Sequence, residues 1–206
     1  MTPFNRVLRR FVFAFAALAV LVACQEKPLQ PLAPGATILA FGDSLTEGKG
    51  VSLGDSYPAV LQRISGMRVV NAGISGEVTA DGLARLPEVL DDVRPQLMLL
   101  LHGGNDILRN LNPSEASENI AAMIQEARSR GIAVVLVGVP EKKLFSDTSP
   151  IYPALAERFK LVFVESIIAD LLRSPSKKSD AVHFNQAGYE EIAQELYDTL
   201  QRTGAL

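Results

Sequence analysis

The stretch ILAFGDSLTEGKG, from Ile38 to Gly50, runs from an apolar segment directly into glycine, aspartate and serine. An apolar run that ends in this way is typical of a buried strand that leads through a tight turn into a helix. At such a turn the hydroxyl of Ser44 projects from the top of the sheet, and its backbone N–H points the same way. The stretch leaves two alternatives: Ser44 is a nucleophile, or it only caps a helix, with Glu47 completing a capping box.

Apolar runs alternate with amphipathic stretches along most of the chain. The runs Leu97–Leu101 and Ile132–Val137 are apolar without alternation, as expected for strands that are covered on both faces. This order predicts a doubly wound α/β fold, a three-layer α/β/α sandwich around a five-stranded parallel sheet. The expected strands are 36–42, 68–73, 96–104, 132–140 and 161–165, and the expected helices are 56–65, 79–93, 114–130, 150–159 and 186–202.

Unusual polar clusters occur at the ends of three of these expected strands. GDS ends the first strand, NAGISGE the second and HGGND the third. In parallel sheets ligands bind outside the carboxyl ends of the strands, so the clusters predict one site at that edge. A phosphate-binding P-loop does not fit, because five residues rather than four separate Gly42 from Gly48, and glycine rather than Ser or Thr follows Lys49.

The chain has two histidines, and a serine nucleophile needs one of them as a base, together with a group that orients it. His183 lies in SDAVHFNQAG, three residues after Asp180, and this spacing on a tight loop directs a carboxylate and an imidazole to one point. His102 ends the run LMLLL with only Asp106 at comparable spacing, so it is interpreted as a packed histidine and kept as a minor candidate. Asp43 and Asp106 are interpreted as residues that brace loops, or as ordinary turn residues.

Four motifs resemble the sequence blocks of the SGNH/GDSL hydrolases. FGDSLTEG resembles block I, NAGISGE block II, GGND block III and DAVH the block V pattern DxxH, in the family's order. Within the family the chain is most similar to the small bacterial thioesterase I, lysophospholipase L1 and arylesterase group. The resemblance implies the flavodoxin-like SGNH hydrolase fold. One departure is Phe184, where the family commonly has proline, and we expect it to loosen the local backbone without abolishing activity.

The resemblance also implies a role for each matched residue. Ser44 is implied as the nucleophile, His183 as the general base and Asp180 as the carboxylate that orients the imidazole. The implied oxyanion hole combines the backbone N–H groups of Ser44 and Gly76 with the side-chain amide of Asn105. The implied reaction is acyl transfer to water through an acyl-serine. It needs no cofactor and no metal, and one cysteine with two separated histidines gives no zinc-type cluster.

Members of this family cleave acyl thioesters, aryl and short-chain esters, and lysophospholipids, so the resemblance implies a small ester or lipid substrate. The segments ILRNLNPSEA and EKKLFSDTSP are expected to frame an acyl pocket, with Leu108, Leu111, Leu144 and Phe145 as candidate lining residues. Two alternatives remain open: a carbohydrate O-deacetylase of the cell envelope, and a non-catalytic, lipid-anchored binding module. The protein is expected to be a monomer.

The N-terminal residues have the features of a secretory signal. Three arginines precede the uncharged run FVFAFAALAVLVA, whose 13 residues are too few to span a bilayer. The only cysteine, Cys24, follows directly, and LVAC resembles the lipobox of bacterial lipoproteins, in which the cysteine is acylated. The sequence thus predicts a signal peptide at 1–23, a lipidated tether at 24–35 and a hydrolase domain at 36–206. By the same resemblance, Gln25 in place of aspartate favours an outer-membrane lipoprotein that faces the periplasm.

The charge balance excludes one class of partner. Residues 1–23 contain three arginines and no acidic residue, so the rest of the chain carries 17 basic against 23 acidic side chains. Nucleic-acid binding requires a basic footprint, so an acidic surface of this kind does not support it. The length of 206 residues and the 48% hydrophobic content are those of one globular domain.

Overall fold

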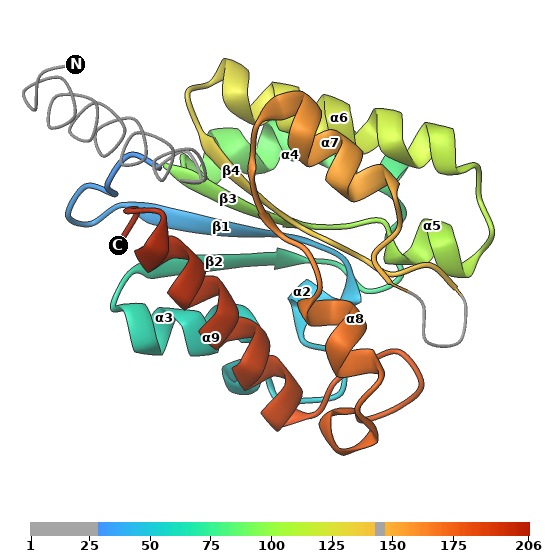
Figure 1. Cartoon of the computed structure of the whole chain (residues 1–206). Helices are drawn as coiled ribbons and strands as arrows, with labels where there is room; N and C mark the ends of the chain where they lie inside the picture. The colour runs from blue at the N-terminus through green and yellow to red at the C-terminus, as the bar shows by residue number, and fades with distance from the viewer. Residues whose placement is uncertain (1–28, 143–146) are drawn as a thin grey trace, which may run out of the picture.

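A parallel sheet forms the middle layer of the protein (Figure 1), for which the computed structural model describes residues 29–142 and 147–206. All neighbouring strands are parallel, and their order is β2-β1-β3-β4-β5. The predicted α/β fold is confirmed, and each strand lies inside the range expected from the sequence. The strands are β1 (Thr37–Gly42), β2 (Arg68–Gly73), β3 (Leu97–Leu101), β4 (Ala133–Val137) and β5 (Val162–Val164).

Helices cover both faces of the sheet, with α3 and α9 on one face and α4, α6 and α7 on the other (Figure 1). These five occur where the sequence predicts them: α3 (Tyr57–Ser65), α4 (Thr79–Val93), α6 (Pro113–Ser129), α7 (Ile151–Phe159) and α9 (Gln186–Arg202). The helix expected directly after the first strand is α2 (Ser44–Glu47). The sequence does not predict α5 (Gly104–Leu108) and α8 (Ile167–Leu172), because helices this short carry no clear apolar period. Single 3-10 turns occur at Leu53–Asp55 and Pro175–Lys177.

The two central strands are buried along their whole length. Every residue of β1 and β3 is buried, whereas the edge strand β2 is partly exposed. Both faces of the central strands are covered, as their unbroken apolar runs predict. In their parallel pairing Ile38 lies opposite Leu97 and Gly42 opposite Leu101. This register brings the residues that follow β1 and β3 out at the same height, at the carboxyl edge of the sheet.

The strand order places a topological switch point between β1 and β3. From β1 the chain moves to β2 on one side, and it then returns to β3 on the other side and continues outward. In doubly wound sheets the loops diverge at such a point and leave a crevice, which is the usual place for a ligand. Ser44 follows β1 and Asn105 follows β3, so the fold puts both beside this crevice.

Gly42 allows the end of β1 to approach β3 closely. A Cβ atom at this position would lie 2.0 Å from the backbone oxygen of Leu101. We therefore expect Gly42→Ala to lower the free energy of unfolding by about 2–3 kcal/mol, measured by urea denaturation. Gly54→Ala is the matched control, because no atom lies within 4 Å of the added methyl group, and it should stay within about 0.5 kcal/mol of wild type. Equal losses in both variants would contradict the expected clash.

The segment before β1 is attached to the amino-terminal edge of the sheet. The backbone N–H of Leu29 donates to the carbonyl of Thr203 at 2.7 Å, and that of Leu32 to the carbonyl of Ala205 at 2.9 Å. The N–H of Ala33 donates to the side chain of Gln96, which directly precedes β3. Residues 29–33, which the sequence assigns to a tether, thus lie against the domain.

The N-terminal predictions concern residues outside the described part of the chain. The signal peptide at 1–23 and the lipidation site Cys24 both fall there, so they stay predictions. Within residues 29–142 and 147–206, none of the helices has the length and hydropathy that a membrane crossing requires.

Candidate active site

Helix α2 begins directly after β1, and Asp43 caps it. The Asp43 carboxylate accepts a hydrogen bond from the N–H of Leu45 at 3.1 Å, which makes Ser44 the first helical residue. The alternative in which Ser44 is the helix cap is therefore wrong. Glu47 closes no capping box either, because its carboxylate accepts a hydrogen bond from the hydroxyl of Ser75 on the loop after β2.

Asp43 also connects the two sides of the switch point. Its carboxylate is buried, and it accepts hydrogen bonds from the N–H of Leu45 in α2 and from that of Gly104 at the start of α5. Burial raises the pKa of Asp43 above its usual range, although these hydrogen bonds and the two histidines act in the opposite direction. Leu45 directly follows Ser44, and Gly104 directly precedes Asn105. By binding Leu45 and Gly104, Asp43 therefore fixes the distance between Ser44 and Asn105.

Glycine is required at the two positions after α2, 48 and 50, for different physical reasons. Gly48 ends the helix in the left-handed conformation, at φ +98°, and its N–H donates to the carbonyl of Ser44. Gly50 has the same φ, and a Cβ atom there would lie 2.2 Å from the hydroxyl oxygen of Ser179. The turn after Ser44 therefore packs closely against the loop that carries His183.

Asp180, His183 and Ser44 form one chain of hydrogen bonds. The Nε2 atom of His183 lies 3.0 Å from Oγ of Ser44, and its Nδ1 atom lies 2.7 Å from Oδ2 of Asp180. The other carboxylate oxygen accepts the backbone N–H groups of Val182 and His183 at 2.9 and 2.8 Å. The N–H of Val182 and the imidazole lower the pKa of Asp180 to about 2, so its carboxylate acts only as an acceptor at neutral pH. The structure thus brings together the three residues that the sequence singles out.

Phe184 anchors the loop that carries this chain of hydrogen bonds. Its ring is fully buried and packs edge-to-face on Tyr189, with the ring centroids 5.8 Å apart. The hydroxyl of Tyr189 donates to the carbonyl of Lys49, and the N–H of Ser179 donates to the carbonyl of His183. The loop is therefore tied to the core and to the turn after α2, against the expectation that Phe184 loosens it.

The candidate oxyanion donors come from three segments. The N–H of Ser44 lies in the first turn of α2, where backbone N–H groups have no partner within the helix. The amide of Asn105 donates one hydrogen to the carbonyl of Glu77 at 3.0 Å, which leaves its second hydrogen for a ligand. Gly76 has a φ of +80°, which favours glycine, and its carbonyl accepts from the guanidinium of Arg109 at 2.6 Å. Ser44 and Asn105 line the same pocket, whereas Gly76 lies outside its lining.

His102 has a structural environment away from Ser44. Its Nδ1 atom accepts the N–H of Gly103 at 2.9 Å, so Nε2 carries the proton and donates to Glu77 at 3.0 Å. The carboxylate of Glu77 also accepts two hydrogen bonds from Arg85, both at 2.6 Å. The interpretation of His102 as a packed histidine is confirmed, and Glu77 rather than Asp106 is its carboxylate partner.

Sequence reasoning missed Glu77 and Arg85, which together support the loop that carries Gly76. Arg85 donates to the carbonyl of Ala72 at the end of β2 and stacks over the ring of Phe41 in β1. The signal available in the sequence was an acidic residue directly after ISG, followed by an arginine two helical turns later. Asp106, in turn, braces α4 through hydrogen bonds from the N–H and the hydroxyl of Thr79.

The network predicts a pH-dependent contribution of Glu77 to stability. Burial raises the pKa of Glu77, but hydrogen bonds from His102 and Arg85 outweigh it and lower the value to about 2 from 4.5. A lowered pKa stabilises the fold above the unfolded-state value, and this contribution is lost as the pH falls from 4.5 towards 2. We therefore expect Glu77→Gln to lower the free energy of unfolding by about 1–3 kcal/mol at pH 7, with a smaller difference at acid pH.

Urea denaturation between neutral and acid pH measures this difference. Glu88→Gln is the matched control, because Glu88 is an exposed glutamate on the same helix, α4. The control should follow wild type at every pH. A Glu77→Gln deficit that stays constant down to acid pH would contradict the assignment to the ionised carboxylate.

A pocket of about 510 Å³ opens beside Ser44 and His183. Most of its wall is apolar, with α5 on one side, α8 on the other, and the segment after β4 between them. The candidate Leu108 lines it, Leu111 does not, and Leu144 and Phe145 lie outside the described residues. Ile107, in the predicted framing segment ILRNLNPSEA, also lines the pocket. The sequence reasoning missed other apolar lining residues, which include Val139, Pro140, Ile168, Ala169 and Leu172.

Comparisons with known proteins agree with this geometry. Residues 40–191 match the GDSL-like Lipase/Acylhydrolase family. Esterase TesA from Pseudomonas aeruginosa is 30% identical over 203 residues, which cover 93% of this chain and 98% of the relative. Thioesterase 1/protease 1/lysophospholipase L1 from Escherichia coli K12 is 30% identical over 210 residues, covering 98% of this chain and 97% of the relative.

A solved structure supports the same assignment. The crystal structure of TesA superposes with a TM-score of 0.74 at 30% sequence identity, covering 81% of this chain and 99% of that one. The matched segment runs from β1 into α9, so it includes Ser44, Asn105, Asp180 and His183. With the family match, the two full-length relatives and the shared fold, the chain belongs to the GDSL-like lipase/acylhydrolase family and is a hydrolase of the GDSL type.

Proposed function

We propose that the protein is a serine esterase in which Ser44, His183 and Asp180 act as a catalytic triad. The observation that carries this proposal is the continuous hydrogen-bond chain from Asp180 through His183 to Ser44 at the wall of an apolar pocket. A neutral imidazole that donates to a carboxylate through Nδ1 has a lone pair on Nε2, which is the atom that faces the serine hydroxyl.

The proposed reaction proceeds in two halves. Oγ of Ser44 bonds to the ester carbonyl carbon while its proton passes to Nε2 of His183, and the oxyanion is held by the N–H of Ser44 and the amide of Asn105. The bond to the alcohol then breaks as His183 returns the proton to the leaving oxygen. In the second half water attacks the acyl-serine while His183 takes its proton. The bond between the acyl carbon and Oγ then breaks, the acid leaves, and His183 returns the proton to Ser44. Gly76 is proposed as the third oxyanion donor.

The pocket favours an acyl group longer than acetyl. Its volume of about 510 Å³ and its apolar walls would leave most of the space empty around an acetyl group. This favours the esterase over the carbohydrate O-deacetylase, which needs a narrow acetyl-sized site. Because each buried methylene contributes up to about 0.8 kcal/mol, we expect kcat/KM to rise by about 10-fold or more from p-nitrophenyl acetate to the octanoate. A maximum at acetate would instead support the deacetylase.

For the N-terminus we propose cleavage after residue 23 and acylation of Cys24, which places the domain outside the cytoplasm on a membrane. The order of basic residues, apolar run and LVAC quartet supports this proposal. The outer membrane, with the domain facing the periplasm, is the proposed location, and a single chain is the proposed functional unit.

Covalent labelling tests the proposed nucleophile. A fluorophosphonate should react with one serine of the chain from Gln25 onward, and peptide mapping should identify it as Ser44. An excess of p-nitrophenyl butyrate should slow the labelling, because both compounds occupy the same pocket. The control is Ser75→Ala, which removes a nearby exposed serine and should label like wild type. Labelling at another serine, or none at all, would refute the proposed nucleophile.

A further inference from the structure

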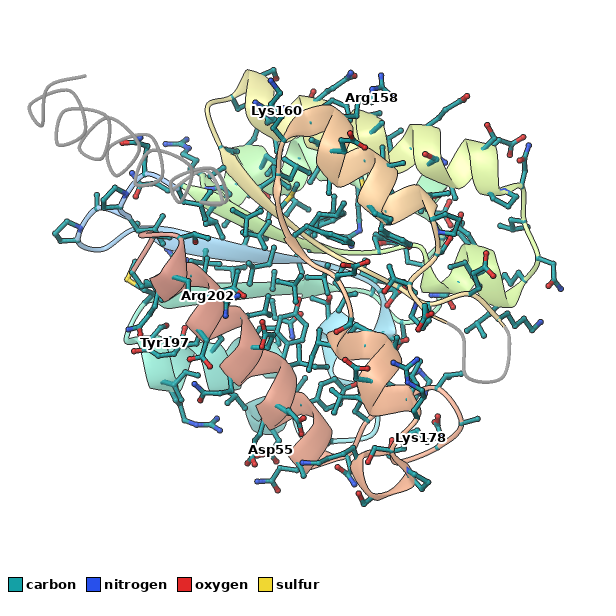
Figure 2. The ribbon with its side chains drawn as sticks, viewed as in Figure 1. Asp55, Arg158, Lys160, Lys178, Tyr197 and Arg202 are labelled. Carbon is teal, nitrogen blue, oxygen red and sulfur yellow. The ribbon has the colours of Figure 1, made fainter. Side chains whose placement is uncertain are left out.

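The attachment of residues 29–33 determines where an N-terminal anchor joins the domain. The N–H of Leu29 donates to the carbonyl of Thr203, which directly follows α9. Helix α9 begins at Gln186, three residues after His183, and runs back to the amino-terminal edge of the sheet. In Figure 2 Arg202, the last residue of α9, lies on the left, and Lys178, which lines the pocket, lies well away from it at the lower right.

The length of α9 can be compared with the reach of the chain between Cys24 and Leu29. The 17 residues of α9 span about 25 Å between the pocket end and the attachment point of Leu29. Four residues separate Cys24 from Leu29, and even when fully extended this connection reaches at most about 18 Å. The connection is therefore shorter than the distance from the attachment point to the pocket.

We propose that the anchored protein takes its ester substrates from the aqueous compartment and not from the membrane that holds its own acyl chains. This inference rests on the proposed acyl-serine chemistry and on the proposed acylation of Cys24. The pocket lies at the carboxyl edge of the sheet, so contact between that edge and the bilayer would lift Leu29 about 25 Å from the surface. Because the connection cannot span that distance, the carboxyl edge and its pocket cannot rest on the anchor membrane. The substrate class is water-dissolved esters, including amphiphiles that are present as single molecules.

Fluorophosphonates of three kinds test this orientation. The full-length lipoprotein is purified, reconstituted in vesicles of phosphatidylethanolamine and phosphatidylglycerol, and treated with a soluble probe. A second probe carries the fluorophosphonate directly on a phospholipid headgroup, and a third adds a polyethylene glycol spacer longer than about 25 Å. We expect the probe without a spacer to label Ser44 at least about 10-fold more slowly than the probe with the spacer. Labelling between separate vesicles is measured in parallel and subtracted.

Lengthening the chain between Cys24 and Leu29 provides the second test. An insertion of about twenty Gly and Ser residues between Pro28 and Leu29 should give the probe without a spacer fast access to Ser44. The same insertion after Leu206 is the matched control and should leave the slow rate unchanged. Equal rates with both lipid probes in the wild-type protein would overturn the inference.

The soluble probe separates this result from a failure of the proposed function. If it labels the anchored protein and the chain from Gln25 onward at the same rate, the active site is intact and the lipid probes report orientation alone. No reaction with the soluble probe would instead refute the serine nucleophile. A mass spectrum showing unmodified Cys24 in the purified protein would overturn the anchor, and with it the orientation.

Discussion

Replacing His183 with alanine is expected to lower kcat for p-nitrophenyl butyrate by about 10⁴- to 10⁶-fold, with little change in KM. The imidazole lies 3.0 Å from the hydroxyl of Ser44, and the described part of the chain places no other histidine near that hydroxyl. His102, the second histidine, is buried with both nitrogens bonded to other groups. Without His183 the proton of Ser44 has no acceptor as the new bond forms.

The proposed triad gives this prediction two controls. Ser44→Ala should cause a loss of the same size, and the double variant should lose no more than either single variant, because the residues act as one unit. An activity above about one tenth of wild type in His183→Ala would exclude His183 as the base. Unfolding midpoints close to wild type in both variants would show that the loss is chemical, since His183 is not part of the buried core.

Measuring kcat of an Asp180→Asn variant as a function of pH tests the role of Asp180. Its pKa of about 2 means that the carboxylate stays ionised over the whole range in which the enzyme is assayed. Because the carboxylate is ionised at every assay pH, Asp180→Asn should lower kcat by a factor of the order of 10⁴ on the plateau of the pH profile. The acid limb of the wild-type pH profile should not arise from this carboxylate. A loss smaller than about tenfold on that plateau would contradict the assignment.

The parts of the fold and site that the sequence predicts are those set by local patterns. Apolar runs without alternation located the buried strands, and the spacing of Asp180 and His183 on one short loop located their contact. A tight loop needs only its own residues to bring such a pair together. Because β1 and β3 are parallel, their carboxyl ends lie at the same edge of the sheet, and this places Ser44 and Asn105 there.

The remaining features depend on contacts between distant segments. Glu77 meets His102 only after the loop behind β2 folds onto β3, and no local period in the sequence marks that contact. Helix α8 completes the pocket but is only one and a half turns long, too short for a clear helical pattern. The spacing of Ile168 and Leu172, one turn apart in SIIADLL, was the one available sign of its apolar face.

Asn105→Ala is expected to lower kcat for the butyrate ester by about 10²- to 10³-fold, or 2.7–4 kcal/mol of transition-state stabilisation, with KM nearly unchanged. One hydrogen of its amide is bound to the carbonyl of Glu77, which holds the side chain in place, and Asn105 lines the pocket together with Ser44. A donor fixed in this way gains most from the charge that develops on the substrate oxygen, so its loss affects turnover more than binding. The rate of fluorophosphonate labelling should fall in parallel, because the phosphoryl oxygen occupies the same position.

A structural role of Asn105 alone would give a different result. Asn119→Ala is the matched control, since the Asn119 amide donates to the hydroxyl of Thr79 beside the same loop but does not line the pocket. Both variants remove one hydrogen bond from a partly buried amide, so both should lower the unfolding midpoint by similar amounts. Only Asn105→Ala should lower kcat. Losses of kcat that are equal in the two variants would mean that the amide supports the loop after β2 without stabilising the oxyanion, and the hole would then consist of backbone N–H groups alone.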